Sequence, residues 1–203
     1  MRKICQASIP LLLAVAVMVL SASPAHASEF TFSLGSLLTD DSPYAGEVEL
    51  RRPDEYSLLV AGRLGSYQGR VGFEGSITYA AKALRIGLFD GALAFDARAV
   101  FAELNVLVNV LQGSFQPFVT AGLGAHVYEL TDINGDRAVK FGYNFGAGLR
   151  YVSGSFVFRG DVRDHVTNLD ISDFGFGLEN VIVGDRSATV HNIELSVGVG
   201  VIF

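Results

Sequence analysis

The C-terminal end of the chain constrains the fold most, because apolar and polar residues alternate there without a break. One side of segment 192–203 carries branched aliphatic residues and ends on Phe203, while the other carries Asn192, Glu194, Ser196 and two glycines. Side chains of a β-strand point alternately to opposite faces, so a period of two predicts a strand with one apolar face. A helix would repeat its apolar residues every three to four positions.

The same alternation recurs in seven other segments, which gives eight predicted strands. The other seven lie near residues 30–35, 58–65, 71–79, 100–110, 119–127, 141–151 and 156–165. Most are close to the roughly 9–11 residues that a tilted strand needs to cross a bilayer. Half of the chain is hydrophobic, yet residues 28–203 contain no apolar run long enough for a spanning helix. Strands that are apolar on one side account for this excess.

The polar sides of these strands carry glycines and charged residues near mid-strand. The predicted network is Arg63, Glu74, Glu103, Arg150, Arg159, Asp161, Arg163 and Glu194, with His165 beside them. Acids and bases balance, as a narrow lumen filled by ion pairs requires, and the glycines make room for long side chains. A sheet that crosses lipid must close, because its backbone finds no water there. We therefore predict an all-β, eight-stranded antiparallel up-and-down transmembrane β-barrel.

The predicted connections alternate in length. Short turns are expected near 66–70, 111–116 and 152–155, and long polar connections near 39–55 and 166–189. Short periplasmic turns and longer outer loops are typical of outer-membrane barrels. Aromatic residues are expected at the two rims. Phe115, Tyr151 and Phe203 are expected at one rim. Tyr79, Tyr128 and Phe141 are expected at the other.

Asp90-Gly91 is a typical two-residue hairpin turn between the third and fourth strands. If it closes the hairpin, Phe73 faces Val108 and Tyr79 faces Ala102, and both strands extend beyond the membrane. A barrel of ten strands is the alternative, but no turn signal interrupts residues 80–88.

The N-terminus predicts export. A basic start, an apolar run over residues 9–20 and Ala25-His26-Ala27 form a secretory signal with cleavage after Ala27. The expected domains are therefore a signal peptide over 1–27 and a barrel over 28–203. Cys5 precedes the apolar run, so lipid attachment there is not expected.

The expected location is the outer membrane of a Gram-negative cell. Periplasmic chaperones and the barrel-assembly machinery are the expected partners during export, and outer-membrane lipid is expected around the barrel. A formal net charge of −6 argues against nucleic acid as a partner.

Three stretches carry a resemblance to a known family. Residues 117–124, 141–151 and 159–165 resemble the outer-membrane β-barrel family related to the transmembrane domain of outer membrane protein A, within the wider porin-like superfamily. The resemblance implies an eight-stranded barrel, and it implies that Phe203 is the signal for the assembly machinery. Members of the family serve as structural, adhesive or host-interacting proteins. A related barrel enzyme, a lipid A deacylase, uses a His-x-Ser pair, whereas His126 here precedes Val127-Tyr128.

The sequence predicts no catalytic residues, no cofactor and no metal. We interpret Asp161, Asp164 and His165 as lumen packing rather than as an acid–base cluster. The spacing of acidic residues in 132–136 lacks that of a calcium loop. The preferred hypothesis is a structural or surface-interaction barrel, not an enzyme, whose external loop partner the sequence does not identify. A narrow gated channel and, ranked last, a lipid-modifying enzyme remain as alternatives.

Overall fold

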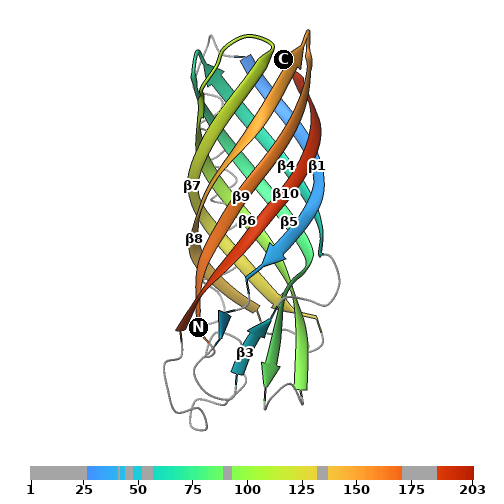
Figure 1. Cartoon of the computed structure of the whole chain (residues 1–203), viewed down its shortest axis with the longest axis vertical. Coiled ribbons are helices and arrows are strands. Elements are labelled where there is room, and N and C mark those ends of the chain that lie inside the picture. Colours follow the sequence, from blue (N-terminus) through green and yellow to red (C-terminus); the bar gives the residue numbers. More distant parts are fainter. Residues whose placement is uncertain are drawn as a thin grey trace, which may run out of the picture.

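The computed structural model describes residues 27–40, 42–43, 48–51, 57–88, 93–131, 137–170 and 187–203, and their regular elements are all β-strands. Eight long strands wind around one axis (Figure 1). They are β1 (Ala27–Thr39), β4 (Ser57–Gln68), β5 (Val71–Leu88), β6 (Leu93–Asn109), β7 (Phe115–Leu130), β8 (Arg137–Ser153), β9 (Phe156–Asp170) and β10 (Ser187–Ile202). Within these residues no helix has the length and apolarity to cross a membrane.

The sheet closes on itself. Every long strand is hydrogen-bonded to two antiparallel neighbours, β1 pairs with β10, and the β5–β6 pairing joins the two ends of the strand order. The predicted eight-stranded barrel is therefore confirmed. Two further strands, β2 (Ser42–Pro43) and β3 (Val48–Arg51), lie outside the wall, so the ten-stranded alternative is wrong.

The two ends of the barrel differ as the sequence predicts. Tight turns follow β4, β6 and β8, and they lie at the same end as the C-terminus (Figure 1), which we call the turn end. Gly69 and Gly154 have φ of 61° and 60° in the two-residue turns, a conformation that glycine adopts at little cost. The strand ends that flank residues 40–56, 89–92, 131–136 and 171–186 lie at the opposite end, which we call the loop end. The predicted signal peptide up to residue 26, residues 132–136 and the Asp90-Gly91 turn lie outside the described residues.

The β5–β6 hairpin extends beyond the wall at the loop end (Figure 1), as predicted. Its outer part has the predicted register, with Leu88 opposite Leu93. In the membrane part the predicted partners are wrong by two residues, since Phe73 faces Val106 and Tyr79 faces Val100. A bulge between Ala80 and Leu84 adds two residues to β5, which shifts the partners while it leaves the side chains of residues 71–79 on their predicted faces.

The connection between β1 and β4 is not only a loop. β3 pairs with β5 from Val48 opposite Leu88 to Arg51 opposite Arg85. At the loop end the β5–β6 hairpin extends past Ser57, where β4 begins, and this leaves an edge of β5 that β4 does not pair. β3 covers that edge, which would otherwise offer free backbone groups to other chains.

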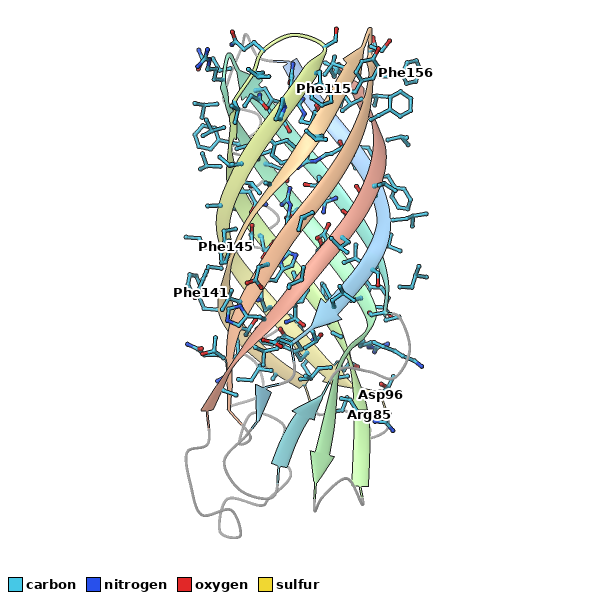
Figure 2. All side chains as sticks on the ribbon, in the orientation of Figure 1. Arg85, Asp96, Phe115, Phe141, Phe145 and Phe156 are labelled. Atoms are coloured by element: carbon cyan, nitrogen blue, oxygen red, sulfur yellow. The ribbon has the colours of Figure 1, made fainter. Side chains whose placement is uncertain are left out.

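Apolar side chains form the outer surface over most of the barrel height (Figure 2). Val197 is 71% exposed and Val106 is 44% exposed, while their chain neighbours point inward. The predicted rim residues Phe115, Tyr151, Phe203, Tyr79 and Phe141 are all exposed. Tyr128 is the exception. It is fully buried inside the barrel, because its position in the alternation of β7 is the inward one.

Candidate functional site

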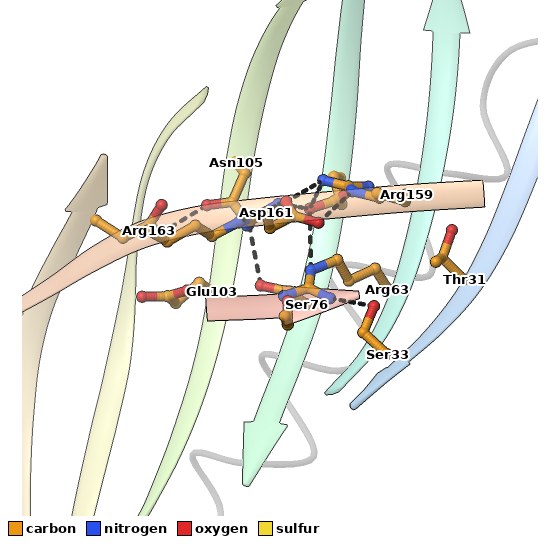
Figure 3. Close-up of polar contacts among 12 residues, drawn as sticks. Thr31, Ser33, Arg63, Ser76, Glu103, Asn105, Arg159, Asp161 and Arg163 are labelled. Atoms are coloured by element: carbon orange, nitrogen blue, oxygen red, sulfur yellow. Dashed lines mark hydrogen bonds and ion pairs between the residues drawn. The ribbon is translucent and has the colours of Figure 1, made fainter. Parts of the chain in front are cut away.

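The interior holds every residue of the predicted charge network. These residues come from six strands, β4, β5, β6, β8, β9 and β10. Each is at most 4% exposed: Arg63, Glu74, Glu103, Arg150, Arg159, Asp161, Arg163, His165 and Glu194. Figure 3 shows part of the resulting web of polar contacts.

Glu74 is the centre of the largest ionic cluster. Its carboxylate pairs with Arg159, and with Arg163 at 2.8 Å. Asp161 accepts hydrogen bonds from both arginines, at 2.8 Å from Arg159 and 3.0 Å from Arg163. Two carboxylates and two guanidiniums therefore compensate one another where water is excluded, and the parallel N–H donors of arginine suit this arrangement.

Arg63 links this cluster to the next one. Its guanidinium pairs with Glu194, donates to the Ser33 hydroxyl at 2.8 Å and lies 3.9 Å from Glu74. Ser196 also donates to Glu194. Strands β1, β4, β5 and β10 are thus connected across the lumen as well as along the wall.

A second ion pair near the turn end involves a residue that sequence reasoning missed. Arg150 pairs with Glu29 and donates to Gln116 at 2.7 Å, and its guanidinium lies 3.8 Å from the centre of the Tyr67 ring. Glu29 is 1% exposed. The alternation of β1 extends back from Thr31 to Glu29, so the sequence pattern could have placed Glu29 in the interior.

Glycines on β8 make room for the inward side chains of neighbouring strands. A Cβ atom on Gly146 would lie 2.9 Å from the Arg163 Cγ atom, and one on Gly142 would overlap the His126 ring. The predicted role of the inward glycines is therefore confirmed at these two positions.

Glu103 contacts two buried histidines instead of an arginine. His126 Nε2 and His165 Nδ1 both lie 2.9 Å from Glu103 Oε1. The other ring nitrogens are also engaged, His126 Nδ1 with Thr167 at 2.6 Å and His165 Nε2 with Glu194 at 3.1 Å. Sequence reasoning placed Glu103 and His165 in the lumen but did not group them, because residue spacing alone does not show which inward positions meet across the barrel.

Polar contacts continue from these histidines toward the loop end. The Tyr128 hydroxyl lies 3.0 Å from Thr167 Oγ1 and accepts a hydrogen bond from Asn192 at 2.8 Å. Thr39 in turn donates to Asn192 at 2.9 Å.

The interior becomes apolar around Tyr128, toward the loop end of the barrel. A cluster of buried side chains from all eight long strands fills the loop end, and we call it the apolar plug: Leu37, Leu59, Ala61, Ala80, Ala83, Leu84, Ala97, Ala99, Phe101, Tyr128, Leu130, Ala138, Leu169 and Val190. The sequence analysis expected charges and glycines in the lumen and did not predict the plug. The apolar residues at inward positions near the loop ends of the strands were the sequence signal that could have predicted it.

The predicted grouping of Asp161, Asp164 and His165 in the lumen is wrong for Asp164. Asp161 and His165 point inward without contacting each other, whereas Asp164 lies on the opposite face of β9, toward the outside. There Asp164 Oδ2 lies 2.7 Å from Nδ1 of His191, whose side chain is 41% exposed. Successive side chains of a strand point to opposite faces, so residue 164 cannot share a face with residues 161 and 165.

Comparison with known proteins bears on the fold alone. No family model matches the sequence, and no curated protein matches it. Neisserial surface protein A has 15% sequence identity and a TM-score of 0.59 over 87% of this chain and 97% of its own. The chain has the fold of the small outer-membrane β-barrels. The predicted resemblance to that group of proteins is thereby confirmed for the fold.

Two further solved structures also align over most of the chain. The attachment invasion locus protein of Yersinia pestis has 13% identity and a TM-score of 0.46 over 87% of this chain and 99% of its own. The outer membrane enzyme PagL has 14% identity and a TM-score of 0.43 over 85% of this chain and 98% of its own.

Proposed function

We propose that the protein is an outer-membrane barrel with a structural or surface-interaction role, which presents its loop end to the outside of the cell and does not conduct solutes. The observation that carries this proposal is the filling of the interior. Ion pairs occupy the turn half, and the apolar plug occupies the loop half. An eight-stranded barrel is narrow enough for side chains to fill.

Location in a membrane is supported by the outer surface. Exposed aromatic and aliphatic side chains cover it on every long strand (Figure 2), and an apolar patch of this extent is too large for a soluble monomer. We propose delivery by the predicted signal peptide and recognition of Phe203 by the assembly machinery. Phe203 is 72% exposed, and its backbone pairs with Ser28. Outer-membrane fractionation and heat-modifiable migration of Phe203→Ala test this, and normal assembly of that variant would contradict the role of Phe203.

Conductance in planar bilayers tests the closed interior against the channel alternative. The folded wild-type barrel is expected to give no sustained, well-defined openings. Openings that change in size or selectivity in Glu103→Gln or Arg159→Gln would establish a channel gated by the lumen charges and would contradict the proposal.

A comparison of cells separates a structural role from a surface role. A strain without the gene is complemented either with the wild type or with a barrel in which residues 171–186 are replaced by a short Gly-Ser linker. If the barrel is structural, both restore resistance to detergents and large antibiotics. If the loop end binds a partner, only the wild type restores adhesion to immobilised matrix proteins. Failure of the wild type to change either property would overturn both roles.

We also propose that the barrel is not an enzyme. Glu103, His126 and His165 are buried between the plug and the ionic half of the interior, out of reach of a lipid substrate. Identical lipid A mass profiles with and without the gene are expected, and loss of an acyl chain that depends on the gene would contradict this.

A further inference from the structure

We propose that Glu103, His126 and His165 bind one divalent transition-metal ion, of which Zn²⁺ is the type, inside the barrel. The three residues come from β6, β7 and β9, and one ligand atom from each lies within 4.8 Å of the other two. All three side chains are 0% exposed. They lie at the boundary between the ionic half of the interior and the apolar plug.

The contacts on the far side of each ring turn one nitrogen of each histidine toward the same oxygen of Glu103. Glu194 accepts a hydrogen bond from His165 Nε2–H at 3.1 Å, so in a neutral His165 ring the lone pair of Nδ1 points to Glu103. Thr167 contacts His126 Nδ1 at 2.6 Å, and this leaves Nε2 facing the same carboxylate oxygen. Metal-bound histidines in proteins have this arrangement, with the second ring nitrogen held by a carboxylate or another oxygen.

A positive charge is required between these atoms. A lone pair of a neutral His165 and a carboxylate oxygen would repel each other at 2.9 Å. Among the described residues, the buried charged side chains of the interior are five carboxylates and four guanidiniums. Glu103 is the one of these carboxylates that has no arginine partner among them. Its second oxygen, Oε2, is buried without a hydrogen-bond partner, which leaves a further ligand position.

The donor set selects the class of ion. Two imidazole nitrogens and one carboxylate match zinc and neighbouring first-row metals, whereas Ca²⁺ and Mg²⁺ prefer oxygen alone. Ligand atoms around tetrahedral zinc lie roughly 3.4 Å apart, given metal–ligand distances of about 2.0–2.1 Å. Both contacts of Glu103 Oε1 are already shorter than this. All three ligand atoms lie within 4.8 Å of one another, so side-chain rotations that move the carboxylate away from the rings and bring the ring nitrogens to similar distances would hold the ion.

The surroundings indicate that the ion enters during folding. The Phe101 ring stacks on His165 at 4.6 Å and meets His126 edge-on at 4.7 Å. Phe101 belongs to the apolar plug, which lies on the loop-end side of the site, and the arginines lie on its turn-end side. A metal bound here would exchange slowly once the barrel has closed, and it would replace the second ring proton that His165 otherwise needs to hydrogen-bond both Glu103 and Glu194.

The experiment is refolding with metal. The mature chain, purified without a histidine tag, is refolded into detergent with equimolar Zn²⁺ or Co²⁺ and separated from free metal in the presence of a chelator. We expect one ion per barrel by elemental analysis, and with Co²⁺ a visible absorption band typical of a site of low coordination number. His126→Gln and His165→Gln are expected to lose the ion and the band. Glu194→Gln is expected to bind about 10–100-fold more weakly, because it removes the oxygen that orients His165.

The matched control is His191→Gln, which alters an exposed histidine on the outer face. It is expected to retain one ion per barrel. Heat-modifiable migration shows which variants are folded. A wild-type barrel that refolds and retains no metal would overturn the proposal and would assign the positive charge to a doubly protonated His165 ring. Equal retention by wild type and folded His165→Gln would also overturn it, because the ion would then be bound elsewhere. If neither histidine variant folds, the metal content and Co²⁺ spectrum of the wild type decide.

Discussion

The two halves of the barrel interior are built from the same eight strands but are filled in opposite ways. In the turn half, long arginine and glutamate side chains pair across the lumen beside glycines. In the loop half, alanine and leucine side chains pack together with Phe101 and Tyr128. The ionic half depends on complete pairing, because an unpaired charge there has no water to solvate it. The apolar plug depends on volume, because a missing methyl group leaves a cavity. Alternation therefore determines which side chains point inward, but it does not determine what holds each half together.

Removal of the central carboxylate gives the largest expected effect. Glu74→Gln leaves Arg159 and Arg163 short of negative charge inside the barrel, and breaking such a buried pair costs about 4 kcal/mol. The free energy of unfolding, from urea titration of the barrel in phospholipid vesicles, measures this. A loss no larger than that of an exposed ion pair would show that water reaches the ionic half.

Truncation in the plug ranks second. Leu84→Ala, at a side chain that is fully buried, is expected to lower the free energy of unfolding by about 3 kcal/mol through lost burial and a residual cavity. The same titration measures it. Unlike Glu74→Gln, this variant is expected to keep its stability loss at all salt concentrations, so a strong salt dependence would contradict the assignment of the plug as apolar.

Overpacking beside the histidines is expected to have a smaller effect. In Gly142→Ala the new Cβ overlaps the His126 ring, so β8 or the ring must shift at a cost of about 2 kcal/mol. Gly62→Ala is the matched control, because a Cβ there meets nothing within 4 Å. Equal stability of the two variants would show that His126 occupies another position.

The smallest effect is expected outside both halves. Arg98 and Glu129 pair at 2.7 Å near the loop end, and their side chains are 41% and 36% exposed. Exposed pairs of this kind contribute little. Arg98→Ala is therefore expected to leave the urea midpoint unchanged, and a clear loss would mean that this pair is shielded from water.

The sequence predicted the wall of the barrel better than its filling. Strand number, inward and outward faces and the position of the tight turns follow from the alternation and from glycine turns, which are local signals. The two-residue shift at Ala80–Leu84 could not be predicted, because a bulge of two residues preserves the alternation. The contacts of Glu103 with His126 and His165 could not be predicted either, because they depend on which strands meet across the lumen. Tyr128 and Asp164 were placed on the wrong side although the alternation itself gave their correct faces.

The central claim is that apolar side chains face lipid while charged ones face inward, and β10 offers the most direct measurement. Cys5 is the chain's single cysteine and precedes the predicted cleavage site, so single cysteines from residue 193 to 200 carry a fluorescent label without interference. Quenching by lipid-borne bromine is expected to be strong at the odd positions, including Val197→Cys, and weak at even positions such as Ser196→Cys. Quenching that shows no period of two, or that is stronger at the even positions, would contradict the account.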